Sequence, residues 1–113
     1  MYKIYHNPRC KKSRAGLKFL EENKIDFEIV NYLKDPIGIE KLTDLFAKLN
    51  RKPSEMIRKQ EAIFKSDFKG KEFTEEEWIR IISQHPKLMH RPIVEGKYKA
   101  VWGEPVENIK EIL

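Results

Sequence analysis

The sequence contains a single cysteine, Cys10, within the strongly basic segment HNPRCKKSR at residues 6–14. Four of these nine residues are Arg or Lys, and no acidic residue stands between Met1 and Leu20. A buried structural cysteine gains nothing from such charge, whereas a thiolate nucleophile or a thiol that meets an anion does. We therefore interpret Cys10 as a reactive thiolate rather than as a small core residue.

The segment around Cys10 joins a predicted strand to a predicted helix that begins at Ser13. Helix N-termini carry unpaired N–H donors and partial positive charge, which stabilise thiolates and oxyanions. Such surroundings lower the pKa of a thiol below its usual value of about 8.5. The flanking cations are expected to act in the same direction through Coulomb attraction, and they are Arg9, Lys11, Lys12 and Arg14.

Two polar side chains of the same segment are candidates for supporting roles in catalysis. His6 precedes the cysteine by four residues and could add positive charge or accept a proton. Ser13 carries a hydroxyl that can hydrogen-bond a thiolate or a bound anion. We therefore group His6 and Ser13 with Cys10 as candidate catalytic residues.

Motifs that are absent from the sequence exclude several kinds of chemistry for Cys10. Ser13 stands where a Cys-x-x-Cys motif would hold its second cysteine, so a redox cycle needs a thiol from another molecule. A tyrosine-phosphatase loop needs a longer separation than the three residues between Cys10 and Arg14. The cysteine and the histidines at 6, 85 and 90 lack the spacing of a metal site, so we expect no bound metal.

The composition is typical of a globular protein, with 40% hydrophobic and 36% charged residues among 113. The net charge is +5, but 18 acidic residues are mixed with 23 basic ones, so we expect no direct nucleic-acid binding. No apolar run is long enough for a membrane span, and the first residues do not resemble a signal peptide. A single cysteine fits a reducing compartment, so we expect a cytoplasmic protein. We also expect a monomer.

The N-terminal part of the chain predicts a βαβ unit. A strand is expected over 2–6, and a helix follows from Ser13 with one face formed by Leu17, Leu20 and Ala15. A second strand is expected over 26–32, where Phe27 and Ile29 alternate with other residues. Because strands joined through a helix are usually parallel, we expect these two to pair in parallel.

A block of three predicted helices follows the βαβ unit. Apolar residues recur at helical spacing over 37–50, and a short helix is expected over 52–61 with Ser54 as its N-cap. The third helix is predicted to begin at a capping box formed by Thr74 and Glu77.

The C-terminal part predicts a ββα unit. Two β-prone runs around Gly96 within 91–102 indicate a hairpin, and Pro105 stands where a last helix would begin. A βαβ unit and a ββα unit around one mixed sheet make an α/β fold of the thioredoxin/glutaredoxin type. We predict a single thioredoxin-like domain over 1–113, with a helical insertion at about 37–88 between its halves.

Several segments, in chain order, resemble those of the arsenate reductases that work with glutathione and glutaredoxin. HNPRCKKSR is similar to the catalytic segment of that family, His-Asn-Pro-x-Cys-x-x-Ser-Arg. QHPKLMHRPIV at 84–94 resembles the family's approach to a cis-proline, and further family segments are similar to NYLKDP, MIRKQE and GEPVENIKEIL. The resemblance runs from residue 2 to 113, and the first two patterns together are more specific than either alone.

The resemblance implies a thioredoxin-like fold with a helical insertion and a thiol chemistry that acts on arsenate. In that chemistry the Cys10 thiolate attacks arsenate, and glutathione joins the adduct as a co-substrate. Glutaredoxin then takes over the mixed disulfide, and arsenite leaves. No resident cofactor is implied.

The resemblance also implies an oxyanion site built from arginines, whose planar fork of donors suits a tetrahedral anion. Arg58 of MIRKQE and Arg91 of HRPIV match two of the family's three arginine positions, and Arg14 belongs to the catalytic segment. Pro92 matches the family's cis-proline, although only about one X–Pro bond in twenty is cis. We therefore expect all three arginines to bind the oxyanion and the bond before Pro92 to be cis.

One position departs from the family pattern and keeps other functions open. Glu104 precedes Pro105, where the family has its third arginine, and a carboxylate repels a dianionic substrate. One alternative is therefore a transcriptional regulator that binds RNA polymerase, as do the Spx-type proteins that share this fold. The other is a glutathione-dependent thiol transferase in which Cys10 forms a mixed disulfide.

Overall fold

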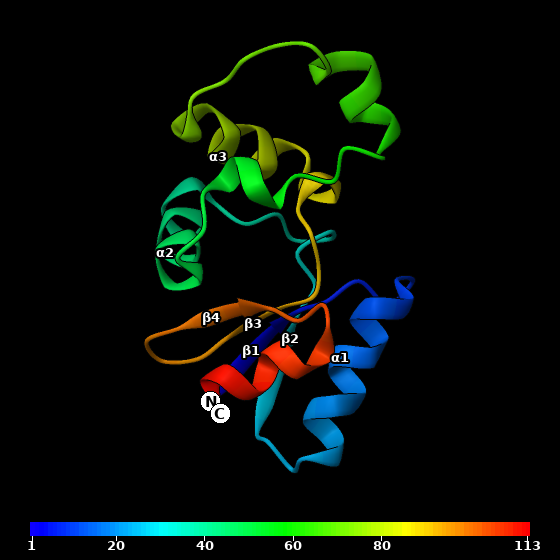
Figure 1. Cartoon of the computed structure of the whole chain (residues 1–113), viewed down its shortest axis with the longest axis vertical. Helices are drawn as coiled ribbons and strands as arrows, with labels where there is room; N and C mark the ends of the chain where they lie inside the picture. Colours follow the sequence, from blue (N-terminus) through cyan, green and yellow to red (C-terminus); the bar gives the residue numbers. More distant parts are fainter. The chain divides into compact units, whose positions relative to one another are not determined.

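The computed structural model describes residues 1–113, which divide into two compact units (Figure 1). The first unit consists of Met1–Asp35 and Arg91–Leu113, and the second consists of Pro36–His90. The second unit therefore begins and ends within a few residues of the predicted insertion at 37–88. The assignment of both units to a single domain stays a prediction.

The first unit is built on a four-stranded sheet with the strand order β2-β1-β3-β4. The strands are β1 (Tyr2–Tyr5), β2 (Phe27–Val30), β3 (Ile93–Glu95) and β4 (Ala100–Trp102). β1 pairs in parallel with β2 and antiparallel with β3, and β3 pairs antiparallel with β4. The predicted α/β fold with a mixed sheet, a parallel first pair and a C-terminal hairpin is confirmed.

Two helices and the sheet enclose the core of the first unit. Helix α1 (Lys11–Glu22) and the C-terminal 3-10 helix (Val106–Ile112) contact one another beneath the sheet (Figure 1). Their apolar side chains join those of β1 and β3 in a cluster that is fully buried at Ile4, Leu20, Val94 and Ile109. Because both helices are anchored to this cluster, the start of α1 is held at a fixed place beside the end of β1.

The structure corrects four local predictions in the first unit. α1 begins at Lys11 rather than Ser13, and Ala15 is exposed, so it does not belong to the buried face. Ile29 is also exposed, at 53%, because β2 pairs only with β1 and is an edge strand of the sheet. The last element is a 3-10 helix that follows Pro105.

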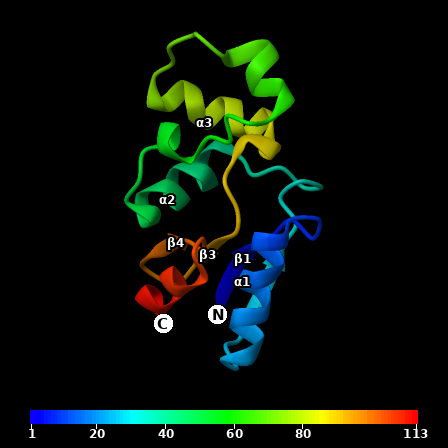
Figure 2. The ribbon, with the colours of Figure 1, turned by 45° about the vertical axis from the view of Figure 1, so that its right-hand side comes forward.

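The second unit is helical, and its two α-helices lie side by side in both views (Figures 1 and 2). α2 spans Ile39–Leu49 and α3 spans Glu75–Gln84, and each buries an apolar face. The predicted capping box is confirmed: the Glu77 N–H donates to Thr74 Oγ1 over 3.1 Å, and the Thr74 N–H donates to Glu77 Oε1 over 2.9 Å. None of the helices combines the length and the hydrophobicity that a membrane-spanning segment requires.

The predicted helix over 52–61 is only a short 3-10 turn, Pro53–Met56. It stops there because Ile57 pairs with Met89 in an isolated β-bridge. Ser54 does not cap this turn, so that prediction is wrong. Its N–H and hydroxyl instead donate to the Glu75 carboxylate over 3.0 Å and 2.8 Å, which ties the turn to α3.

Candidate active site around Cys10

Cys10 is the residue immediately before α1, at the end of a tight loop that leaves β1. The loop is closed by Asn7, whose backbone oxygen accepts from the Cys10 N–H over 3.0 Å and whose Oδ1 accepts from the Arg9 N–H over 3.0 Å. The Cys10 carbonyl oxygen accepts from the Arg14 N–H, also over 3.0 Å, as the first turn of the helix forms. The half-buried thiol is therefore placed at the positive end of α1, as the sequence predicts.

The surroundings of Cys10 favour its thiolate. Burial raises the pKa of the thiol, but the backbone N–H of Ser13, a hydrogen bond from the Arg91 guanidinium and the backbone N–H of Lys12 lower it by more. The positive charge of Arg91 also acts in this direction, and the net result is a pKa below that of an ordinary thiol. The site therefore supplies a nucleophile that is ionised more readily than a free cysteine.

The cations that flank Cys10 in the sequence do not cause this shift, which corrects the prediction made for them. The pKa of Cys10 is lowered by two helix amides and by Arg91, which comes from the segment before β3. Arg14 turns away to the loop, where its Nη1 donates to the Pro8 carbonyl oxygen over 3.0 Å. Its exposed guanidinium thus has a structural partner in the catalytic segment.

His6 and Ser13 form a buried pair beneath the loop. His6 Nδ1 lies 2.6 Å from Ser13 Oγ, and the same oxygen accepts from the Asn7 N–H over 2.9 Å. Burial lowers the pKa of His6, a hydrogen bond with Ser13 raises it, and the charge of Arg14 lowers it again. Because the net shift is downward from 6.5, His6 is neutral at pH 7, with Nδ1 hydrogen-bonded to Ser13 Oγ.

The His6–Ser13 pair decides two questions that the sequence left open: whether His6 carries a positive charge, and how Ser13 acts on Cys10. His6 does not add a positive charge near neutral pH, because its pKa is lowered from 6.5. The Ser13 hydroxyl is occupied by His6 and the loop, so Ser13 acts on Cys10 through its backbone N–H. Both residues therefore support the loop that positions the thiolate.

Arg91 is held at Cys10 by the segment that enters β3. The Arg91–Pro92 peptide bond is cis. The Arg91 carbonyl oxygen accepts from Trp102 Nε1 over 3.4 Å, and the Pro92 carbonyl oxygen accepts from the Gly103 N–H over 2.8 Å. Trp102 and Gly103 were not among the residues singled out from the sequence, because their contribution depends on the pairing of β3 with β4.

Arg58 lies in the second unit, where it forms a backbone hydrogen bond and an ion pair. Its N–H donates to the Leu88 carbonyl oxygen over 2.7 Å, and its Nε forms an ion pair with Glu61 Oε2 over 3.2 Å. The ion pair is largely buried, with the two side chains 17% and 22% exposed. The carboxylate fixes the guanidinium, and a role in oxyanion binding stays a prediction.

Glu104 forms an ion pair with Lys12, one of the lysines of the catalytic segment. Its Oε1 lies 3.8 Å from Lys12 Nζ, in an ion pair that is partly open to solvent. The carboxylate noted in the sequence therefore lies at the first turn of α1 and offsets one of the positive charges there. No three His, Cys, Asp or Glu side chains of residues 1–113 group together in a way that could hold a metal ion.

The chain is similar to proteins of known family over nearly its full length, and residues 5–112 match the ArsC family. It is 41% identical over 113 residues to a Neisseria meningitidis serogroup A protein named arsenate reductase, covering 98% of this chain and 97% of the relative. It is 36% identical over 112 residues to the arsenate reductase of Haemophilus influenzae, covering 97% of each. The solved structure of an arsenate reductase from Vibrio cholerae matches with a TM-score of 0.92 at 33% identity, covering 99% of this chain and 97% of that one.

Proposed function

Because this chain belongs to the ArsC family, with its thioredoxin-like fold, we propose that it reduces arsenate with Cys10 as the nucleophile. The observation that carries the proposal is the surroundings of the Cys10 sulfur, where two helix amides and the Arg91 guanidinium lower the thiol pKa. The same donors suit an oxyanion, because they concentrate positive potential around the sulfur. No carboxylate is among the groups that shift the pKa of Cys10. Nucleophile and anion site therefore coincide.

The first step is a condensation that leaves arsenic pentavalent. The Cys10 sulfur attacks arsenic, an As–S bond forms, and an As–O bond breaks as the departing oxygen takes up protons and leaves as water. Arg91 offsets the negative charge on the remaining arsenate oxygens. His6 and Ser13 act as positioning residues, because they hold the loop that aims the helix amides at the sulfur.

The reduction itself needs thiols from other molecules, because Ser13 cannot form a disulfide with Cys10. Glutathione condenses with the adduct, which forms a second As–S bond and releases water. A glutaredoxin thiolate then attacks the glutathione sulfur, an S–S bond forms, and the electron pair of the broken As–S bond reduces arsenic to its trivalent state. Water hydrolyses the remaining bond to Cys10, and arsenite leaves. A cytoplasmic location would supply both thiols.

The test is release of arsenite by the purified protein with arsenate, glutathione and glutaredoxin. Cys10→Ser is expected to abolish release, and Arg91→Gln is expected to lower the rate by roughly a hundredfold, as loss of a charge-stabilising donor does. Arg58→Gln asks whether the second predicted arginine takes part. Arg80→Gln removes an exposed arginine from α3 and serves as the matched control. Unchanged release by Cys10→Ser would overturn the proposal.

The Lys12–Glu104 ion pair favours a thiol transferase as the second candidate function. Glu104 offsets a cation at the first turn of α1, where a dianionic oxyanion would gain from it. A mixed disulfide carries no charge at the sulfur that Cys10 attacks, so it does not depend on that cation. Reduction of hydroxyethyl disulfide by glutathione and this protein, without arsenate, would identify this activity.

A further inference from the structure

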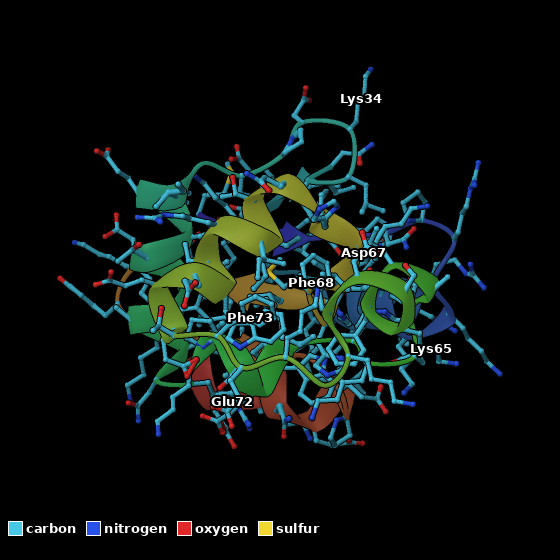
Figure 3. The ribbon with its side chains drawn as sticks, turned by 90° about the horizontal axis from the view of Figure 1, so that it is seen from above. Lys34, Lys65, Asp67, Phe68, Glu72 and Phe73 are labelled. Atoms are coloured by element: carbon cyan, nitrogen blue, oxygen red, sulfur yellow. The ribbon has the colours of Figure 1, made fainter.

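The second unit contains a cluster of aromatic rings that the proposed reaction does not use. Phe73 meets Trp78 edge to face, with ring centroids 4.9 Å apart, and Phe64 lies nearly parallel to Trp78, with centroids 6.5 Å apart and an interplanar angle of 19°. Phe68 lies beside Phe73, with centroids 5.8 Å apart (Figure 3). These rings form one continuous aromatic surface around Trp78.

The aromatic cluster borders a pocket of about 470 Å³. Ile57 and Trp78 line it and are buried, whereas Phe64 and Phe73 line it and are only half-buried. Small-molecule sites typically have volumes of about 300–1,000 Å³. The pocket is therefore large enough for a molecule of one or two rings, and its walls offer aromatic faces and edges to stack against.

Charged groups at the rim of the pocket indicate the sign of a ligand. Lys59, Lys71 and Glu72 line the pocket and are exposed. Neither lysine forms an ion pair within the chain. Among the charged residues that line the pocket, two are cationic and one is anionic, which favours an anionic group. The Glu75 carboxylate, which accepts from the N–H and hydroxyl of Ser54, does not line the pocket.

The segment that begins with the wall residue Phe64 has an unusual backbone. Phe64–Phe68 is a π-helical turn, closed where the Lys69 N–H donates to the Phe64 carbonyl oxygen over 2.8 Å. Gly70 follows with a φ of +79°, a conformation that side chains other than glycine rarely adopt, and it too lines the pocket. π-helical turns recur at functional sites, where they redirect side chains.

We propose that this pocket binds a small planar aromatic anion, with its ring against Phe64, Phe73 and Trp78 and its charged group between Lys59 and Lys71. The site lies wholly within the second unit, Pro36–His90. Cys10 does not line the pocket, so the test of ligand binding does not depend on the proposed reductase activity.

Naphthalene sulfonate is a suitable probe, and its binding to the isotope-labelled full chain can be followed by NMR. The expected result is saturable movement of the Trp78 indole N–H signal and of the amide signals of 57–73. Neutral naphthol is expected to bind more weakly, and naphthylmethylammonium weaker still, because the rim repels a cation. Cys10→Ser is expected to bind the sulfonate as the unaltered chain does.

Variants at the rim give the sharper test, because exposed lysines can be replaced without disturbing the core. The double variant Lys59→Ala/Lys71→Ala is expected to weaken sulfonate binding by about tenfold, since it removes both charge contacts. Lys65→Ala is the matched control: Lys65 lies on the same segment, points outward (Figure 3) and does not line the pocket. Equal affinity for sulfonate and naphthol, equal weakening by Lys65→Ala, or signals that do not move at millimolar probe would each overturn the proposal.

Discussion

Gly16 allows α1 to approach the segment that positions Arg91, and the substitution Gly16→Ala tests this packing. A Cβ atom at Gly16 would lie 2.8 Å from Pro92 Cγ, closer than real Cβ atoms approach another heavy atom. The Pro92 ring is rigid and buried, and a Cβ at Gly103 would lie only 3.1 Å from the same Pro92 Cγ. The ring therefore has no free space into which it could move.

Two opposing effects set the expected magnitude. Helix propensity alone predicts that alanine in place of glycine stabilises α1 by about 1 kcal/mol. Forcing a methyl group into a packed core costs about 1–3 kcal/mol. Because the contact is with a rigid ring, we expect a packing cost in the upper part of this range, about 2–3 kcal/mol, and therefore a net loss of about 1–2 kcal/mol. For a protein of this size, each kcal/mol lowers the melting temperature by about 4 °C.

Urea unfolding followed by circular dichroism measures this loss directly. Ala15→Gly is the matched control, because Ala15 is exposed on the same helix and should lose only the propensity term of about 1 kcal/mol. Alkylation of Cys10 by iodoacetamide at neutral pH should also slow in Gly16→Ala, because a displaced Pro92 moves Arg91 away from the sulfur. A Gly16→Ala protein as stable as the unaltered chain, or more stable, would refute the packing argument.

Three further predictions follow from the same contacts. Arg91→Gln removes a hydrogen bond and a positive charge from the thiolate, so the pH profile of Cys10 alkylation should move to higher pH, and Arg91→Lys should restore part of the shift. Thr74→Ala should cost about 1 kcal/mol in urea unfolding, and Thr74→Ser should cost little, because only the cap of α3 changes. Burial holds the pKa of His6 below 6.5, so acidification below about pH 6.5 protonates His6 in the unfolded chain before the native one. Stability should therefore fall with acidification in this range, and His6→Gln should remove that part of the fall.

The elements that could be predicted from the sequence are those fixed by local signals. The Thr74–Glu77 capping box and the turn at Gly96 each depend on residues close together in the chain. For the same reason the position of Cys10 at the beginning of α1 could be predicted.

The parts that could not be predicted depend on tertiary contacts. Ser54 resembles an N-cap until Glu75 takes both of its donors, and Ile29 resembles an inward-facing strand residue until β2 becomes an edge strand. The flanking cations looked like the cause of a low thiol pKa, yet Arg91 from the far end of the chain has that role beside the helix amides. Only the family resemblance pointed to Arg91, because its sequence neighbourhood shows nothing of Cys10.

The most direct test of the central claim is the rate of Cys10 alkylation by iodoacetamide as a function of pH, with and without arsenate. Helix amides and Arg91 around the sulfur predict a midpoint below that of free cysteine and slower alkylation when arsenate is present. A midpoint at or above the free-cysteine value, with a rate that arsenate does not change, would contradict it.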